Sequence, residues 1–317
     1  MTDSTTAARR TREGNITLAG LRAFVAVVEA RGFSEGARKL GLTQPSVSVQ
    51  VAALEQACGL LLCRRKPEFE LTEAGRAVFV KARNVMAGVE ELEGVISGAQ
   101  SSPGRFVIGV SVPHVAMPLL TGFRQAFPEV GLELVMGNTA ILLDRLVRCQ
   151  IDVGIMTLIE PAPGFDCTLV STPRLMVCVR SDDAWAQRKS VPVRDLVGRA
   201  MVMREQGSQT RALLDSIFAR AGLLPTQALE MGSREAMREA VAAGLGTGVM
   251  FDNEHGHDMR LALVPLLGIG AKPGVYSVAL RETLGLPAVR RWSHHVRAST
   301  ASKPLPLGQG RRRGVAS

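Results

Sequence analysis

The chain has 317 residues, of which 46% are hydrophobic and 21% charged, and its formal net charge is +9. This length suits one large or two to three ordinary domains with well-filled cores. No stretch is long and apolar enough to span a bilayer, and the N-terminus lacks the hydrophobic core of a secretion signal. These features exclude a membrane-spanning chain and predict a cytoplasmic protein.

The positive charge is unevenly distributed. Seven basic residues and no acidic residue lie between Arg290 and Arg313. The net charge favours an anionic partner, whereas a terminal run of this kind is also typical of a solvated tail. Residues 1–15 are predicted to be a disordered arm, and residues 300–317 a disordered basic tail.

Five cysteines are present, an odd number without CxxC spacing: Cys58, Cys63, Cys149, Cys167 and Cys178. That pattern argues against a disulfide framework and against a zinc site. In a reducing cytosol we expect thiols. The sequence therefore predicts no metal and no cofactor.

Two helices are predicted near the N-terminus. Apolar residues recur at helical spacing between Thr17 and about Ala30, which indicates the first helix. Ser34 is expected to cap the second helix, and Gly41 is expected to end it.

A third helix follows directly. Thr43 is placed to cap it, and Pro45 falls in its first turn, where a missing N–H costs nothing. Val47, Val51 and Leu54 recur at i, i+4 and i+7, so they predict its buried face.

The next segment predicts a wing and a long helix. Alternation around Phe69 and Leu71, just after Pro67, indicates a short hairpin, and Thr72 begins a helix that runs to about residue 98. The predicted apolar face of this helix consists of Ala77, Val80, Val85, Val89, Leu92 and Ile96. Because a long amphipathic helix needs a partner, it is either a core helix or a dimerisation helix.

After a linker at 101–104 the pattern changes to alternating strands and helices. Strands are predicted at 105–111, 132–137, 153–157, 174–180, 200–205, 228–232, 247–251 and 274–282. Repeated βα units imply mainly parallel sheets sandwiched by helices. The length suggests two such lobes, with the chain crossing near 171–173 and again near 271–274.

The N-terminal motif resembles that of the LysR-type transcriptional regulators. It stands here as LGLTQPSVSVQVAALE at 40–55, followed by LTEAG at 71–75. Two residues depart from the family pattern. Cys63 stands where the family usually has phenylalanine, and Gly36 replaces a usual alanine. Both are expected to loosen this domain slightly.

The resemblance covers nearly the whole chain. It implies an α-helical winged helix-turn-helix domain plus an α/β two-lobed effector domain like type 2 periplasmic-binding proteins. The implied parts are a DNA-binding domain at 16–72, a linker helix at 73–100 and an effector domain at 104–299. Lobe I would take 104–171 and 274–299, and lobe II 172–273. Family members are usually homo-oligomers, most often tetramers built as paired dimers, that activate or repress genes.

The polar face of the third helix predicts double-stranded DNA as a partner. Glutamine can pair with adenine, and hydroxyls serve bases or phosphates. The candidates for base contact are Gln44, Pro45, Ser46 and Gln50, and those for phosphate contact are Thr43, Ser48, Arg64, Arg65 and Lys66. Paired recognition helices would lie about 34 Å apart and read a dyad-symmetric site. The alternative is a merely solvated polar face.

Four strand-to-helix junctions of the second region are polar. Ligands bind at such junctions in open α/β sheets, and helix N-termini favour anions. The candidate ligand residues are Ser111, His114, Asn138, Thr139, Ser208, Gln209, Thr210 and Ser233. We therefore expect a small anionic effector between two lobes. The alternative is that these residues are ordinary helix caps or, for the histidine, a structural residue.

A narrower resemblance concerns the effector. Segments at 113–138 and 232–250 look like the branch of the family associated with aminoethylphosphonate catabolism. That resemblance implies a phosphonate as the anionic effector.

Other interpretations stay open. No GxSxG, Walker, HExxH or paired-cysteine signature is present, which argues against an enzyme. A thiol-redox regulator would need an exposed thiolate of low pKa, whereas most of the cysteines have apolar neighbours. A solute receptor would leave the first hundred residues unexplained. The run FDNEHGHDMR at 251–260 suggests a metal site, but it lacks regular ligand spacing and predicts a solvated loop.

Overall fold

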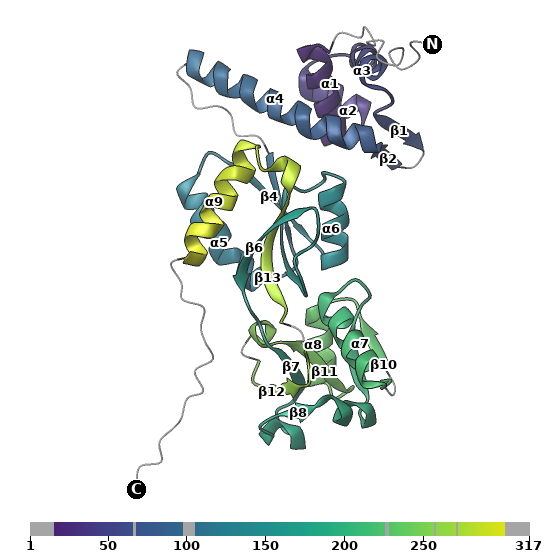
Figure 1. Cartoon of the computed structure of the whole chain (residues 1–317), viewed down its shortest axis with the longest axis vertical. Coiled ribbons are helices and arrows are strands. Elements are labelled where there is room, and N and C mark those ends of the chain that lie inside the picture. The colour runs from purple at the N-terminus through teal and green to yellow at the C-terminus, as the bar shows by residue number, and fades with distance from the viewer. Residues whose placement is uncertain are drawn as a thin grey trace, which may run out of the picture. The chain divides into compact units, whose positions relative to one another are not determined.

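The computed structural model describes residues 16–65, 68–97, 105–225, 228–256, 258–270 and 272–301 (Figure 1). Contacts divide the chain into two compact units. The first is Met1–Gly104 with Val147–Gln150 and Glu282–Ala288, and the second is Arg105–Leu146 with Ile151–Arg281 and Val289–Ser317. No helix in the described ranges is long and apolar enough to cross a membrane.

The predicted arm and most of the predicted tail lie outside the described residues. At the C-terminal end the structure corrects one boundary. Helix α9 continues to Ala301, and the Thr300 hydroxyl donates to the Arg297 carbonyl at 3.0 Å. The first two residues of the predicted tail are therefore helical.

The first unit is a helical domain with a hairpin. Its elements are α1 (Leu18–Glu29), α2 (Phe33–Leu40), α3 (Gln44–Cys58), β1 (Leu62–Arg65), β2 (Glu68–Leu71) and α4 (Glu73–Ser97). Phe24, Val47, Val51, Leu54 and Phe79 form its core, and each is at most 2% exposed. The predicted inward face of the third helix is thus confirmed.

The helix ends follow from local chemistry. The hydroxyls of Thr17 and Thr43 accept hydrogen bonds from the N–H three residues on, at 3.0 and 3.4 Å. Gly41 ends α2 with a φ of 65°, in the left-handed region that favours glycine. The cap predicted at Ser34 is wrong, because α2 begins at Phe33 and the preceding glycine occupies the N-cap position.

Gly36 lies against the backbone of α1. A Cβ added to it would be 2.9 Å from both the nitrogen and the Cα of Val27. Real Cβ atoms do not approach backbone that closely, so the glycine allows α2 to pack tightly on α1. The expectation that Gly36 loosens the domain is therefore wrong.

A carboxylate joins α3 to the hairpin. Oε1 of Glu55 accepts from the N–H groups of Leu61 and Leu62 at 2.9 and 3.0 Å. The strands β1 and β2 then pair antiparallel, with Leu62 opposite Leu71. The Thr72 hydroxyl donates to the carbonyl of residue 60 at 2.8 Å, which fixes the start of α4.

Helix α4 changes character along its length. Phe79 and Val80 are buried at 1% and 5% exposure, so the first half belongs to the core. Val85, Leu92 and Ile96 are 47%, 59% and 77% exposed. The apolar pattern therefore serves the core at one end of the helix and leaves uncovered side chains at the other.

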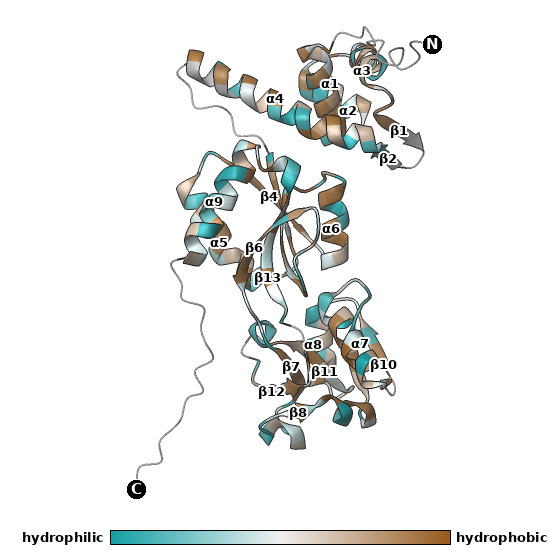
Figure 2. Cartoon of the chain, in the orientation of Figure 1, coloured by the Kyte–Doolittle hydropathy of each residue, from teal (hydrophilic) through white to brown (hydrophobic). Residues whose placement is uncertain are grey.

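The second unit contains two sheets, with strand orders β4-β3-β5-β13-β6 and β10-β9-β11-β7-β12-β8. Brown, hydrophobic residues are prominent on strands of the second sheet such as β7 and β12 (Figure 2). The prediction of mainly parallel sheets holds only in part, because both sheets are mixed: β3 pairs parallel with β4 and β5, and β9 with β10 and β11, but other pairs are antiparallel. β13 pairs antiparallel with both β5 and β6, and β7 pairs antiparallel with both β11 and β12.

Lobe I is built on the first sheet. Its strands are β3 (Arg105–Val110), β4 (Gly131–Met136), β5 (Val153–Leu158), β6 (Phe165–Ser171) and β13 (Gly274–Leu280). Its helices are α5 (Pro113–Ala126), α6 (Thr139–Val147), η4 (Arg281–Thr283) and α9 (Pro287–Ala301). The rings of Phe106, Phe123 and Trp292 pack together, and the Trp292 indole donates to the Ser277 hydroxyl at 2.9 Å.

Lobe II is built on the second sheet. Its strands are β7 (Leu175–Arg180), β8 (Val191–Pro192), β9 (Met201–Arg204), β10 (Ala228–Met231), β11 (Thr247–Phe251) and β12 (Leu261–Leu267). Its helices are η1 (Ala184–Gln187), η2 (Val193–Gly198), α7 (Gln209–Ala221), α8 (Arg234–Ala242) and η3 (Asp252–Glu254). Strands β6, β8 and β12 are absent from the sequence-based expectation.

The chain crosses between the two sheets twice, between β6 and β7 and between β12 and β13. Lobe I is therefore made from two separate parts of the chain, and lobe II from one. This arrangement makes the second unit two α/β lobes, as the resemblance implied.

Candidate functional site

The start of α3 presents the predicted DNA-reading residues on its surface. Gln44 and Pro45 are exposed, and Ser46, Ser48 and Gln50 are half-buried beside them. All five lie in the first two turns, clear of the buried face. The hydroxyl of the sixth, Thr43, caps the helix, as described above.

The predicted phosphate contacts of the wing are only partly described. Arg64 and Arg65 lie in β1, opposite Phe69 and Glu68, and nothing is described of their side chains. Lys66 lies outside the described residues.

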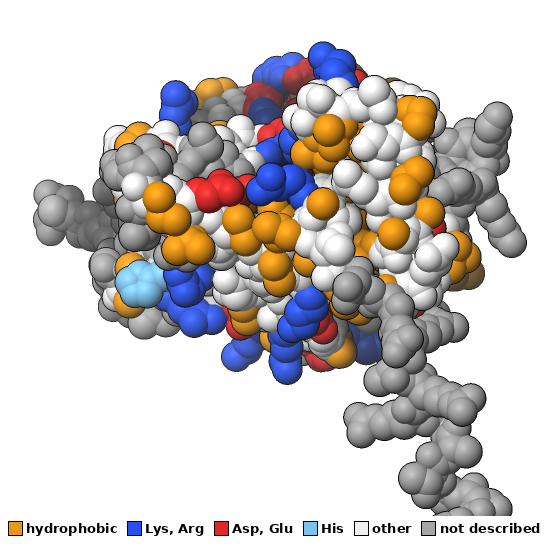
Figure 3. Space-filling model, turned by 90° about the horizontal axis from the view of Figure 1, so that it is seen from above, with side chains coloured by type: hydrophobic (Ala, Val, Ile, Leu, Met, Phe, Trp, Pro, Cys, Tyr) orange, Lys and Arg blue, Asp and Glu red, His pale blue; other side chains and the backbone are white. Residues whose placement is uncertain are grey.

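The basic residues of α2 are paired with acids of the same unit. Lys39 contacts Glu29 at 2.6 Å, and Arg38 makes a bidentate contact with Glu35. The hydrogen bonds from Arg38 lower the pKa of Glu35. Several hydrophobic side chains also reach the surface between charged groups, on the face seen in Figure 3.

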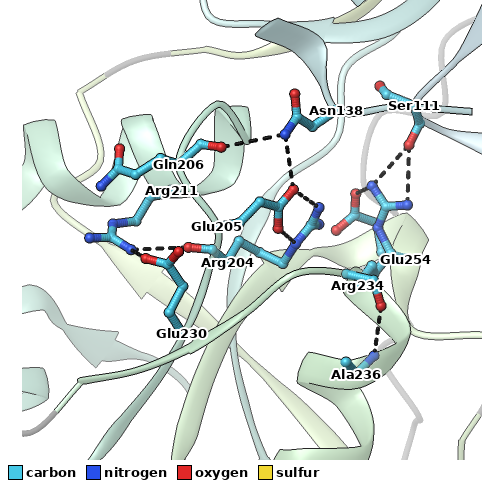
Figure 4. Close-up of polar contacts among 11 residues, drawn as sticks. Ser111, Asn138, Arg204, Glu205, Gln206, Arg211, Glu230, Arg234, Ala236 and Glu254 are labelled. Carbon is cyan, nitrogen blue, oxygen red and sulfur yellow. Dashed lines mark hydrogen bonds and ion pairs between the residues drawn. The ribbon is translucent and has the colours of Figure 1, made fainter. Parts of the chain in front are cut away.

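A first charged cluster joins the lobes at the end of β9. Nε and one terminal nitrogen of Arg204 donate to the two carboxylate oxygens of Glu205 at 2.8 and 2.9 Å (Figure 4). The Asn138 amide of lobe I donates to the same carboxylate at 3.3 Å and to the Gln206 carbonyl at 3.4 Å. Burial favours a higher pKa for Glu205, but the hydrogen bonds from Arg204 and Asn138 outweigh it and lower the pKa.

A second charged cluster joins the lobes at the start of α8. Arg234 contacts Glu254 at 2.7 Å, and both terminal nitrogens donate to the carbonyl of Ser111 in lobe I, at 3.1 and 3.2 Å. The side chains of Arg234 and Glu254 are only 15% and 2% exposed. Glu254 also accepts from the N–H of Phe251 at 3.2 Å. A buried carboxylate with these partners is a fixed part of the interlobe contact.

His114 lies near the second cluster, at the second position of α5. Loss of hydration lowers its pKa, Glu254 opposes that shift, and Arg234 adds to it. Asn253 hydrogen-bonds to the imidazole. With a lowered pKa the ring is neutral at pH 7, so it offers hydrogen bonds and no charge.

Arg211 holds lobe II together beside the first cluster. Its guanidinium donates to the Arg204 carbonyl, to Glu230 and to Asp215, all at about 3.0 Å. These bonds tie the first turn of α7 to the ends of β9 and β10. Arg211 therefore positions the strand that carries Arg204.

Several predicted ligand hydroxyls are buried or already bonded. Thr139 is 3% exposed and donates to the Thr157 carbonyl at 3.2 Å. Ser208 and Thr210 are each 5% exposed. Ser233 accepts from the N–H of residue 236 at 3.0 Å and so caps α8. Ser233 therefore has the capping role of the alternative interpretation, and Thr139 makes a buried structural contact. Ser208 makes no capping bond, and a ligand contact by these residues stays a prediction.

The structure brings other predicted residues together. The carbonyl of Ser111 and the amide of Asn138 each contact lobe II, and His114 lies beside the second cluster. The half-buried Gln209 begins α7, directly after the loop that contacts Asn138. The predicted junctions thus meet in two pairs.

Four charged residues of the clusters were not among the predicted site residues: Arg204, Glu205, Arg234 and Glu254. Three stood in or just before junctions already selected: Arg204 and Glu205 in REQGS, and Arg234 in GSR. A charged side chain next to a polar junction was the available signal. Glu254 was assigned to a solvated loop, which is wrong because the residue is buried.

Acidic and histidine side chains of the 251–260 run have other partners. Asp252 pairs with Arg174 at 2.9 Å, and Asp258 pairs with Arg260 at 2.8 Å. His255 contacts the carbonyl of residue 261 at 3.3 Å, while His257 lies outside the described residues. Among the described residues no group of acids, histidines and cysteines could hold a metal ion.

Two of the described cysteines, Cys178 and Cys167, do not have the character of a redox-sensing thiol. Cys178 is fully buried, and burial raises its pKa to about 12. Burial also raises the pKa of the half-buried Cys167. Both thiols are therefore protonated at neutral pH, the opposite of what sensing requires.

Two family models match the chain. "Bacterial regulatory helix-turn-helix protein, lysR family" covers residues 18–76, and "LysR substrate binding domain" covers residues 99–301. Together they span both units of the structure.

Named relatives share much of this length. HTH-type transcriptional regulator CbbR of Xanthobacter flavus is 29% identical over 92% of this chain and 85% of its own length. CbbR of Rhodospirillum rubrum is 31% identical over 80% and 85%. CysL of Bacillus subtilis is 29% identical over 73% and 79%.

Solved structures share the architecture. Full-length BenM is 26% identical, with a TM-score of 0.55 over 90% of this chain and 97% of its own. A full-length variant of OxyR from Pseudomonas aeruginosa has a TM-score of 0.69 over 89% and 95%, and at 21% identity this likeness is one of fold. The reported relatives are named as transcriptional regulators rather than enzymes. By its helix-turn-helix, its two-lobed sensor and these matches, the chain belongs to the LysR family of DNA-binding transcriptional regulators.

Proposed function

We propose that the chain regulates transcription from a dyad-symmetric DNA site, and that a small anionic effector held between the lobes switches this activity. The observation that carries the effector proposal is the charged contact between the lobes. Arg234 of α8 bonds to the Ser111 carbonyl, and Asn138 bonds to Glu205. An effector that binds one lobe arrangement more tightly than another would shift the population between them.

The charges of the clusters support an anion. Arg204 and Arg234 each hold a carboxylate, and guanidinium groups pair equally well with carboxylate or phosphate-like oxygens. An anion that replaced Glu205 on Arg204 would also disturb the bond to Asn138. The side chain of Ser208 makes no capping bond at α7, and uncapped N–H groups at a helix N-terminus favour an anion.

The class of effector that we propose first is a phosphonate. Its anionic group would take the place of Glu205 on Arg204. The amino group of aminoethylphosphonate would then pair with the released carboxylate. Phosphate, sulfate and small carboxylates carry the anion without the amine, so they separate the two contributions.

Calorimetric titration of the full chain with each of these anions tests the proposal. Arg204→Gln should weaken binding at least tenfold, since a charge-assisted pair is worth about 1.5–3 kcal/mol. Arg194→Gln is the matched control, because the Arg194 side chain is 83% exposed. If no anion gives heat or raises the melting temperature, the effector is not anionic.

We also propose a homo-oligomer, assembled through α4 as paired dimers. The support is the apolar surface of Val85, Leu92 and Ile96, whose exposures make them available to a second copy. Light scattering should give a dimer or tetramer, and Leu92→Glu should shift it toward monomer.

Footprinting with and without effector should show a changed footprint length, and identical footprints would reject the population shift.

A further inference from the structure

The centre of the outward face of α3 is apolar. Val49 follows Val47 by two residues and precedes Val51 by two, which places it about half a turn from both buried residues. Its side chain is 69% exposed. Pro45 and Ala52, one turn before and almost one turn after, are exposed on the same side.

Helix α3 has no cation to bind phosphate. Its sequence, QPSVSVQVAALEQAC, contains one charged residue, Glu55. That carboxylate already accepts the N–H groups of Leu61 and Leu62. Because attraction to the DNA backbone comes from lysine and arginine, α3 must act through hydrogen bonds and van der Waals contact.

Packing against the described residues does not account for a β-branched side chain at this position. Valine is a weaker helix former than alanine, and a side chain 69% exposed gains little from packing. Covering it by a partner would recover that apolar surface. In the major groove, the apolar group that base pairs present is the C5-methyl group of thymine.

We propose that Val49 reads the C5-methyl group of a thymine in each half of the DNA site. The proposal rests on the proposed function, in which α3 enters the major groove. Gln44 and Gln50 flank Val49 and supply the hydrogen-bonding contacts. The same methyl group on 5-methylcytosine would be recognised equally, so α3 would respond to cytosine methylation at that position.

Replacing thymine by uracil tests the proposal, since it deletes only the methyl group. The site is first selected from random DNA with the full chain, and each thymine is then replaced singly by deoxyuridine. We expect one position in each half-site where affinity falls about fourfold, the effect of burying one methyl group. For Val49→Ala the thymine-to-uracil ratio at that position should fall to one.

Further controls distinguish a loss of thymine recognition from a loss of folded structure. Leu60→Ala removes another apolar side chain that is 66% exposed in the same unit, and it should leave the ratio at about fourfold. Helicity by circular dichroism should not fall in Val49→Ala, since alanine favours helix. At the cytosine that replaces the thymine, methylation at C5 should restore affinity for the wild type and not for Val49→Ala.

The possible outcomes distinguish thymine reading by Val49 from the proposed regulation of transcription. Sequence-specific binding that tolerates uracil at every position would overturn the reading by Val49 while leaving the regulator intact. Discrimination that persists in Val49→Ala would assign the methyl contact to another residue. Failure to select any DNA sequence would overturn both proposals.

Discussion

The lack of a side chain at Gly36 should have a measurable effect on the free energy of unfolding. Gly36→Ala places a methyl group 2.9 Å from the α1 backbone, so we expect a loss of about 1–3 kcal/mol, despite the better helix propensity of alanine. Gly198→Ala is the control. Gly198 is exposed in η2 with no atom within 4 Å of an added Cβ, so the same change should alter stability by less than about 0.5 kcal/mol.

The two tryptophans make that comparison practical. Trp185 and Trp292 both lie in the second unit, so their fluorescence reports that unit, while far-UV circular dichroism reports both. Gly36→Ala should lower the melting transition seen by circular dichroism and leave the fluorescence transition in place. Equal or raised stability in Gly36→Ala would show that α2 can move away from α1.

Glu55 links the recognition helix to the wing with a single carboxylate oxygen. Glu55→Ala leaves two N–H groups of buried leucines without their acceptor, and we expect a cost of about 2–3 kcal/mol. Glu55→Gln keeps an acceptor and should cost less than half as much. Urea titration of both variants by circular dichroism tests the order, and equal losses would contradict it.

The buried pair of Arg234 and Glu254 gives a third test. Arg234→Met leaves a carboxylate that is 2% exposed without its partner, so we expect a loss of about 3–5 kcal/mol. Adding Glu254→Gln removes the charge and keeps an acceptor for the N–H of Phe251, and most of the loss should return. Tryptophan fluorescence during urea unfolding measures both. A double variant no more stable than Arg234→Met would mean that charge burial is not the cause.

For single residues, the sequence predicted which positions are polar and functional better than it predicted what each side chain contacts. Thr43 was predicted to cap α3 and does so, because a cap depends on neighbours in the sequence. Ser233 and Thr139 were predicted to touch ligand, yet their hydroxyls serve a helix N-terminus and a buried carbonyl. The partner of Arg234 is 20 residues away and on another element, so no local pattern pointed to it.

At the scale of elements, local periodicity was a good guide to helices and to strands next to helices. It failed for β12, which contains Pro265, and for β6, whose residues are half-buried rather than alternating. Both strands pair antiparallel with strands that are distant in the sequence, β12 with β7 and β6 with β13, and this pairing made the sheets mixed. The βα rule cannot anticipate an antiparallel strand inserted late in the chain.

Strand β7 gives an element-scale prediction. It lies between β11 and β12, and its Cys178 is fully buried with a pKa raised to about 12. Since the folded state holds the proton more tightly than the unfolded state, the stability from this group is complete below about pH 9 and is lost as the pH rises toward 12.

The burial of Cys178 should also slow its alkylation. Iodoacetamide at pH 8 should label Cys178 only at the rate of unfolding, and the half-buried Cys58 sooner. Mass spectrometry of the labelled peptides measures both rates. Rapid labelling of Cys178 in the folded chain would show that β7 opens locally.

For the whole molecule, the interlobe contact should depend on pH. The pKa of Glu205 is lowered in the folded state, so its contribution to stability is present above about pH 4.5 and is lost as the pH falls through the lowered value. Glu205→Gln should remove that part of the acid dependence. The measurement is the fluorescence melting temperature from pH 6 to pH 3, and parallel curves for both proteins would contradict the assignment.

The order of the strands also has a consequence for how the sensor is made. β13 is the last strand of the chain, and it occupies the place between β5 and β6 in the sheet of lobe I. During synthesis, every strand of lobe II leaves the ribosome before β13 does. Lobe I is complete only when β13 has been made, because β13 joins β5 to β6. Closing a contact across more than a hundred residues is entropically slow. A chain that terminates early therefore keeps its DNA-binding unit but lacks the strand that completes its sensor, and it would bind DNA without regulation.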